Sequence, residues 1–175
     1  ILGATQWHQD NGVVIEEADE TDMLTVWFSL HDTDLELGPL KVVPGSHRRG
    51  LRTHCANYLG NGGREIPEKL FDVDKTVNLP VSRGDVIFLH KHTVHGSLAN
   101  VSDRIRWSFD LRYNPIGQTT GREIFPGFVV RSGKPASQEL RDAKTWTRMW
   151  LETREKMSKI NQGGQSDVAF GRWKE

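Results

Sequence analysis

The sequence predicts a mainly β fold, a sandwich or a double-sheet jelly roll with a C-terminal amphipathic helix. Short runs rich in β-branched and aromatic residues, separated by turn residues, recur as far as Tyr113. After NPIG at 114–117 the apolar spacing becomes helical. A length of 175 residues suits one domain with its own core. We therefore expect a single domain over residues 1–175, with a β core at 1–113 and a loop and helical segment at 114–175.

Five segments have the composition of strands. In order, they are TVWFSL at 25–30, LKVV at 40–43, TVNLPV at 76–81, GDVIFLH at 84–90 and RIRWSFDLRY at 104–113. The acidic run at 31–34 ends the first segment, and the turn at 44–46 ends the second. Residues 48–75 mix glycine, asparagine, arginine and charged side chains. We expect these residues to form a long connection that borders a site.

One helix is expected at 141–160. Residues of one helical face recur there at spacings of three and four: Trp146, Met149, Trp150, Thr153 and Met157. Such stripes ordinarily face a core, and less often a partner or a membrane surface. We therefore expect this helix to pack on the outside of a sheet.

The segment at 104–113 has two very different faces if it is a strand. Its odd positions are all apolar, and we expect them to be buried: Ile105, Trp107, Phe109, Leu111 and Tyr113. Its even positions are all polar: Arg104, Arg106, Ser108, Asp110 and Arg112. A polar face is solvated in a one-sided antiparallel sheet, whereas in a jelly roll it can line a ligand cavity. The pattern allows both interpretations.

The composition excludes several partners. The formal net charge is zero, from 23 basic and 23 acidic residues, so no positive field draws the chain to nucleic acid or anionic lipid. No apolar run approaches the length of a membrane span. The single cysteine, Cys55, forms no internal disulfide and suits a reducing compartment. We expect a soluble cytoplasmic protein with no nucleic-acid or membrane partner.

Histidines and a carboxylate supply candidate metal ligands. In WHQD at 7–10, His8 and Asp10 would point to the same side of a strand, which is a chelating arrangement. HKHTVH at 90–95 adds His90, His92 and His95. Two histidines and one carboxylate form the facial set that binds Fe(II) and leaves open positions. Alternation alone does not choose among the three later histidines.

These motifs, taken in order, resemble the phytanoyl-CoA dioxygenase family of Fe(II)/2-oxoglutarate oxygenases. The resemblance runs from residue 7 to about 113 through WHQD, TVWFSLHDTDLELGPLKVVPGSHRRG and RGDVIFLHKHTVHGSLANVSDRIRWSFDLRY. It implies a double-stranded β-helix, the cupin-like jelly roll. It also implies that the N-terminal portion of the family domain, which precedes the H-x-D motif, is missing from these residues.

The resemblance assigns roles to individual residues. It implies that His8, Asp10 and His95 bind iron, and that Arg106, eleven residues after His95, anchors 2-oxoglutarate. A guanidinium offers a planar fork that forms two charge-assisted hydrogen bonds with a carboxylate, which lysine does not imitate. If Arg106 is not this anchor, Arg104 and Arg112 on the same strand face are the next candidates.

Three further residues are expected to line the cosubstrate pocket. The resemblance implies this role for Ser97, two residues after the distal histidine, and for Trp27, on the strand that follows the H-x-D motif. Ser108 is our own inference from alternation. It shares a strand face with Arg106, so we expect it to contact the same carboxylate.

The implied reaction uses Fe(II), O2 and 2-oxoglutarate to hydroxylate a small-molecule substrate, with release of succinate and CO2. Related halogenases lack the carboxylate ligand, so the presence of Asp10 favours hydroxylation. A second hypothesis is a non-catalytic, cupin-like protein that binds a metal or a small acid. A third, an interaction domain that uses its tryptophan-rich helix, explains neither the histidines nor Arg106.

Overall fold

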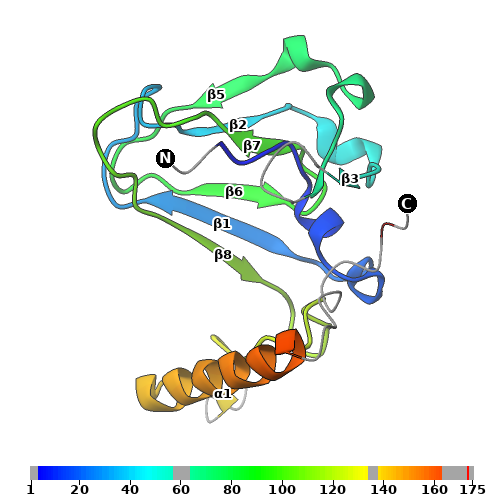
Figure 1. Cartoon of the computed structure of the whole chain (residues 1–175), viewed down its shortest axis with the longest axis vertical. Coiled ribbons are helices and arrows are strands. Elements are labelled where there is room, and N and C mark those ends of the chain that lie inside the picture. Colours follow the sequence, from blue (N-terminus) through cyan, green and yellow to red (C-terminus); the bar gives the residue numbers. More distant parts are fainter. Residues whose placement is uncertain (1–3, 57–63, 134–137, 163–172, 174–175) are drawn as a thin grey trace. The chain divides into compact units, whose positions relative to one another are not determined.

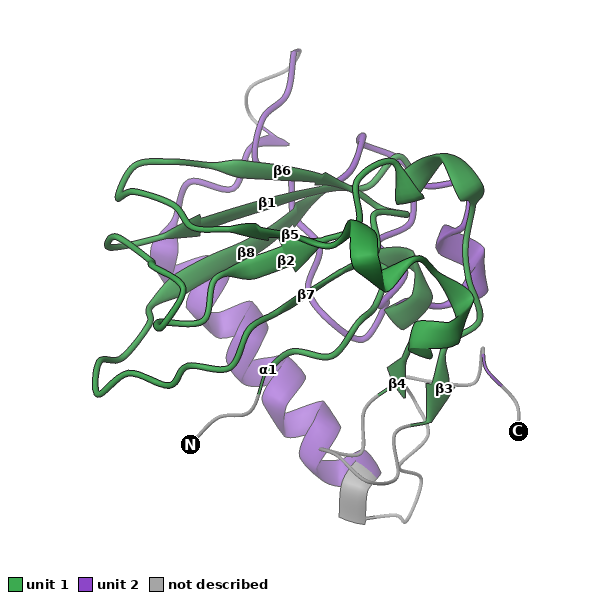
Figure 2. Cartoon of the chain, turned by 90° about the horizontal axis from the view of Figure 1, so that it is seen from above, with its two compact units in different colours: residues 1–13, 22–113, 175 green, residues 14–21, 114–174 purple. Residues whose placement is uncertain are grey.

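The computed structural model describes residues 4–56, 64–133, 138–162 and 173. The chain divides into two compact units, which Figure 2 shows in different colours. The first unit comprises residues 1–13, 22–113 and 175, and the second comprises residues 14–21 and 114–174. All strands of the described residues belong to the first unit, and the α-helix belongs to the second.

Two three-stranded antiparallel sheets build the first unit (Figure 1). One has the order β6-β1-β8, with strands Ile87–His90, Leu24–Ser29 and Ser108–Tyr113. The other has the order β5-β2-β7, with strands Val77–Leu79, Leu40–Val42 and His95–Ser97. A short pair joins β3, Cys55–Ala56, to β4, Arg64–Glu65. Single 3₁₀ turns lie at Asp10–Val13, Ser46–Arg49, Glu68–Leu70 and Val73–Lys75.

The two sheets pack face to face, and apolar side chains fill part of the space between them (Figures 1 and 2). Trp27 and Leu89 of one sheet are buried with Leu40 of the other. Half-buried residues complete this cluster: Val42, Leu79, Val81 and Ile87. The arrangement is a sandwich, as predicted, because each sheet hides one face against the other.

A second apolar cluster fixes the start of the chain. Trp7 is buried with Val43, Ile66 and Val94, and its ring meets the Phe71 ring edge-on at 5.1 Å between centroids. The indole Nε1 of Trp7 also donates a hydrogen bond to Glu68 Oε1 at 3.3 Å. This packing holds the residue that directly precedes His8.

Each of the five predicted strand segments contains a strand. The predicted ends lie within four residues of the observed ones, and β8 starts at Ser108, not at residue 104. Strands β3, β4 and β7 were not predicted. The sequence of β7, His-Gly-Ser, carries no β-branched or aromatic residue, so its composition gives no strand signal. Tertiary pairing with β2 makes it a strand.

The predicted burial of the odd positions at 105–113 is wrong. Ile105 is 72% exposed and Trp107 is 64% exposed, while Phe109 and Tyr113 are also exposed and Leu111 is half-buried. The physical reason is that the β6-β1-β8 sheet turns its even-numbered β8 positions toward the other sheet. The odd positions therefore form its outer face.

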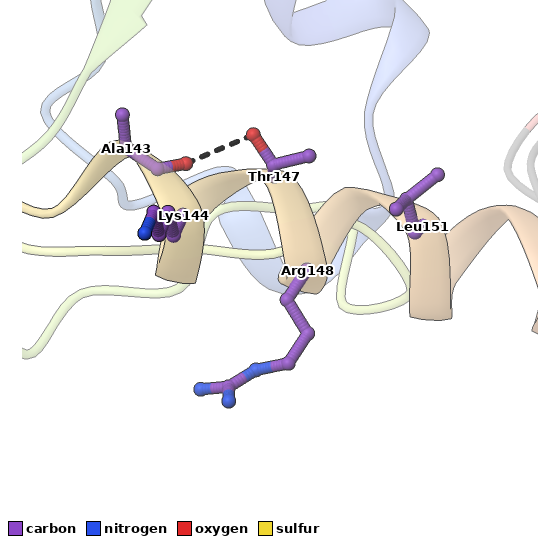
Figure 3. Close-up of a pocket in the computed structure, with 5 residues that line it drawn as sticks. All are labelled: Ala143, Lys144, Thr147, Arg148 and Leu151. Carbon is purple, nitrogen blue, oxygen red and sulfur yellow. Dashed lines mark hydrogen bonds between the residues drawn. The ribbon is translucent and has the colours of Figure 1, made fainter.

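The second unit contains α1, Ala143–Gln162, and the 3₁₀ turn Glu16–Ala18. The predicted stripe of α1 is only partly buried, since Thr153 is buried but Trp146 and Trp150 are exposed. A hollow of about 350 Å³ lies along α1, where the Thr147 hydroxyl donates to the Ala143 carbonyl (Figure 3). None of the predicted site residues lines this hollow. Within the described ranges, no helix is long and apolar enough to cross a membrane.

Candidate metal centre

Backbone pairing brings His8 and His95 together. The two residues form an antiparallel bridge, in which each backbone N–H donates to the carbonyl of the other at 2.9 Å. Directly opposite residues in such a pair carry their side chains on the same side, and the two imidazole centroids lie 4.2 Å apart. Gly96 permits this close approach, because a Cβ at this position would lie 2.7 Å from the Thr5 carbonyl oxygen.

Both imidazoles are oriented in the same way. His8 Nδ1 lies 2.9 Å from the Gln6 carbonyl oxygen, and His95 Nδ1 lies 2.9 Å from the Thr93 carbonyl oxygen. A carbonyl oxygen only accepts, so each Nδ1 carries a proton, and a neutral ring in this orientation presents its lone pair at Nε2. Such a hydrogen bond from the second ring nitrogen is the usual support of a metal-binding histidine.

Asp10 completes the group at the start of a 3₁₀ turn. Its Oδ1 lies 3.8 Å from His8 Nε2 and 3.9 Å from His95 Nε2, and the residue is fully buried. A strand through Asp10 was expected to bring its carboxylate beside His8, and that expectation is wrong. The turn at Asp10–Val13, directly after the bridge at His8, brings the carboxylate to the imidazoles instead.

In the described part of the chain, these three residues form the one group of three metal-ligating side chains whose ligand atoms all lie within 4.8 Å of one another. The other candidate histidines lie elsewhere. The His90 ring contacts the His92 ring at 5.4 Å and the His47 ring at 5.5 Å between centroids. His90 is exposed, whereas His95 is 3% exposed.

The electrostatics favour the ligand forms of these groups. Burial lowers the pKa of His8 from 6.5 to about 4, and the nearby His95 acts in the same direction. Burial works to raise the pKa of Asp10, but His95 and Arg112 oppose it most strongly and the pKa is lowered to about 2. His8 is therefore neutral and Asp10 ionised at neutral pH, the forms that bind a cation.

Thr25 and Arg112 both contact the Asp10 carboxylate. The Thr25 hydroxyl donates to Asp10 Oδ2 at 2.5 Å, and Arg112 Nη2 donates to Asp10 Oδ1 at 2.5 Å. Thr25 was not among the predicted site residues, and Arg112 was only a reserve candidate for the 2-oxoglutarate anchor. The signal that finds them is the pairing of β1 with β8, which places these two residues directly opposite each other.

Arg106 has an unused hydrogen-bond donor. Its guanidinium carbon lies 5.6 Å from the centroid of the Trp27 ring, and its Nη1 is buried without a hydrogen-bond partner among the described residues. Leaving such a group unpaired costs about 1 to 3 kcal/mol, more for a charged group. A carboxylate from a ligand would remove this cost, so Arg106 fits the role of an anion anchor.

The remaining predicted residues lie in different surroundings. Ser97 is 2% exposed, and its Oγ accepts the Thr5 backbone N–H at 2.8 Å, which leaves the hydroxyl proton for another acceptor. Trp27 is buried between the sheets beneath the Arg106 guanidinium. Ser108 is exposed at the start of β8, opposite Ser29.

The family profile of phytanoyl-CoA dioxygenase matches residues 2–108. This chain belongs to the phytanoyl-CoA dioxygenase family. The predicted resemblance is therefore confirmed. The matched span contains the three candidate metal ligands and Arg106, and it ends before Arg112.

Comparisons with individual proteins agree with this membership. The 1-deoxypentalenic acid 11-beta-hydroxylase of Streptomyces arenae is 32% identical over 151 residues, which cover 82% of this chain and 52% of the relative. The chain spans about half the length of the curated relatives that it matches first.

Two solved structures show the fold. The non-heme monooxygenase ThoJ has a TM-score of 0.61 and 22% identity, covering 93% of this chain and 63% of its own. EvdO2 from Micromonospora carbonacea var. aurantiaca, complexed with 2-oxoglutarate, has a TM-score of 0.51 and 22% identity, covering 67% and 49%. The predicted jelly-roll class is confirmed by these likenesses.

Proposed function

We propose that this chain carries the metal and cosubstrate sites of an Fe(II)- and 2-oxoglutarate-dependent dioxygenase that hydroxylates a small molecule. The observation that carries the proposal is the buried set of His8, Asp10 and His95, with both Nε2 atoms turned toward one carboxylate oxygen. Two histidines and one carboxylate are the donors that non-heme Fe(II) oxygenases use. The donor set therefore fits iron.

Each residue would have a separate task. His8, Asp10 and His95 would hold Fe(II), and the bound ion would supply the O2 chemistry. Arg106 would bind the far carboxylate of 2-oxoglutarate through its unused Nη1, while Ser97 would donate its hydroxyl proton to the same cosubstrate. Trp27 would support the guanidinium from below through a cation–π contact. Ser108, at the start of β8, would add a contact at the rim of the pocket.

Hydroxylation of a small molecule is the favoured reaction. Asp10 supplies a carboxylate where related halogenases have none, and its hydrogen bonds with Thr25 and Arg112 support a role as a fixed ligand. The relative from Streptomyces arenae is named as the hydroxylase of a small organic acid, which supports the same reaction class for this protein. Succinate and CO2 would be the coproducts.

The direct test is succinate formation from 2-oxoglutarate. The protein is incubated with Fe(II), ascorbate and 2-oxoglutarate without a prime substrate, since uncoupled turnover still yields succinate. We expect succinate from the wild type and from His90→Ala, and none from His95→Ala. If the wild type binds Fe(II) and 2-oxoglutarate but forms no succinate when a library of small molecules is supplied, the protein is a cupin-like binding protein and the proposal is wrong.

A further inference from the structure

The two oxygens of Asp10 have different neighbours. Oδ1 lies near both imidazole Nε2 atoms and also accepts from Arg112, whereas Oδ2 accepts from the Thr25 hydroxyl. Thr25 and Asp10 are both fully buried. Rotation of the carboxylate would break both hydrogen bonds of a side chain that solvent does not reach, which opposes rotation.

Both supporting residues come from one cross-strand pair. Thr25 of β1 lies directly opposite Arg112 of β8, and both side chains lie on the face that turns toward the other sheet. A shift of one residue in this register would move both side chains to the outer face. The support of Asp10 is therefore built into the pairing of β1 with β8.

Arg112 is itself held at two points. Its Nη2 donates to Asp10, while its Nη1 lies 3.3 Å from Asp110 Oδ1, two residues back on the same strand face. The planar guanidinium thus bridges two carboxylates through different nitrogen atoms. An ammonium group at this position would be a point charge and would not fix the direction of a donor.

We propose that Thr25 and Arg112 are positioning residues of the metal centre, which hold Asp10 so that it binds the metal through Oδ1 alone. This inference rests on the proposed function, because it needs a metal at these residues. Oδ1 faces both imidazole Nε2 atoms, whereas Oδ2 faces the Thr25 hydroxyl, so Oδ1 is the oxygen turned toward an ion that the imidazoles would hold. Single-oxygen binding leaves positions on the ion open for cosubstrate and O2.

A competing role for Arg112 predicts the opposite effect on metal affinity. If its guanidinium competed with the metal for Oδ1, removing it would strengthen metal binding. A carboxylate oxygen has two lone pairs, so it can accept from Arg112 and bind a metal at the same time. We therefore expect removal of either supporting side chain to weaken metal binding.

Thr25 gives the cleaner test, because its removal changes no charge. Ni²⁺ binding to the metal-free protein is measured by calorimetry for the wild type, Thr25→Val and Thr25→Ser. Valine keeps the shape without the hydroxyl, and serine restores the hydroxyl. We expect Ni²⁺ affinity to fall about tenfold to a hundredfold in Thr25→Val and to recover in Thr25→Ser. Equal affinity in Thr25→Val and the wild type overturns the inference.

Arg112 is tested with and without its partner, because Asp10→Ala removes the contact with Asp10 and leaves the charge of Arg112 in place. Ni²⁺ binding is therefore compared for the wild type, Arg112→Gln, Asp10→Ala and the double variant. Ni²⁺ is chosen because imidazole binds it strongly enough to measure the weakened site. We expect Arg112→Gln to weaken binding about tenfold in the wild type and to cause no further loss in Asp10→Ala. Tighter binding in Arg112→Gln, or an equal loss in both backgrounds, overturns the role of Arg112.

The same data separate this inference from the proposed function. If the wild type does not bind Ni²⁺, or if Asp10→Ala binds it as well as the wild type, the metal centre itself is wrong and both proposals fall. If Asp10→Ala loses affinity while Thr25→Val and Arg112→Gln do not, only the positioning role falls. Circular dichroism and thermal unfolding of each metal-free variant establish that the fold is retained.

Discussion

Along β8, the inner and outer faces of the β6-β1-β8 sheet differ in a way that reverses the usual distribution of polar residues. The inner face carries Thr25, Asp110 and Arg112 toward the other sheet, whereas the outer face carries Phe28 and Phe109, stacked at 5.2 Å between ring centroids. Hydrophobic burial alone would favour the opposite orientation. The polar inner face is retained because its charges are paired around Asp10, which indicates that this face serves binding more than stability.

The largest effect is expected on Fe(II) affinity, when one of the candidate metal ligands is removed. Asp10→Ala and His95→Ala each remove one of three metal donors, so we expect Fe(II) affinity to fall by more than about a hundredfold. His90→Ala removes an exposed imidazole of the outer face and should leave the affinity unchanged. Metal content after anaerobic loading gives the measurement. Iron loss in His90→Ala but not in His95→Ala would contradict the assignment and would also remove the reason for choosing Arg106.

Acid should destabilise the metal-free protein through His8. The folded pKa of His8 is about 4 and the usual value is 6.5, so below pH 6.5 the unfolded chain binds a proton that the folded chain does not. Stability therefore falls as the pH falls from 6.5 to about 4, by about 3 kcal/mol in total. Urea unfolding at several pH values measures this change. His8→Gln should flatten the dependence and His90→Gln should retain most of it, whereas an unchanged dependence in His8→Gln would exclude His8 as its source.

The next effect is a loss of 2-oxoglutarate affinity, which we expect from a change at Arg106 and not from one at Arg104. Arg106→Lys replaces a fork by a point charge, so we expect 2-oxoglutarate affinity to fall about tenfold to a hundredfold, as for a charged hydrogen bond worth about 1.5 to 3 kcal/mol. Arg104→Lys is the control, because Arg104 pairs with Asp34 at the surface and its replacement should leave 2-oxoglutarate affinity unchanged. Calorimetry with Ni²⁺-loaded protein avoids turnover. Equal affinity in Arg106→Lys and the wild type would move the anchor to another residue.

The smallest effect is expected on the outer face. Phe109 is 47% exposed and stacks on Phe28, so Phe109→Thr should reduce the free energy of unfolding by about 1 kcal/mol. Metal affinity should stay at the wild-type value, because Phe109 points away from the site. Chemical unfolding and metal titration measure the two quantities. A loss above about 3 kcal/mol would mean that the outer face is a buried core in the protein.

Local composition predicted most of the strands but not the orientation of the sheet. Segments such as TVWFSL carry a strong β signal, and β1 lies within one residue of the prediction. Alternation separated the two faces of β8 correctly but did not determine which face turns inward. The inward face makes contacts that are distant in the sequence, which are the packing of Trp27 and Leu89 on Leu40 and the ion pair of Arg112 with Asp10.

The candidate site was likewise predicted only in part from the sequence. The resemblance to a family singled out His8, Asp10 and His95, and the structure brings them together, but through a 3₁₀ turn that the strand argument did not foresee. Arg106 followed from a count of residues after His95. Thr25 was missed because a threonine within a strand-like run looks like an ordinary β-forming residue. Only the register of β1 against β8 shows that it touches a carboxylate.

The bridge between His8 and His95 has a kinetic consequence. It joins the first described residues of the β unit to β7, so the chain between His8 and His95 must close into one long loop before the two imidazoles meet. Such long-range closure is slow to form. A metal bound across it would act as a reversible cross-link that closes a long loop and slows unfolding, since rupture of the bridge must release the ion first. Chelators should therefore shorten the lifetime of the native state as well as remove the ion.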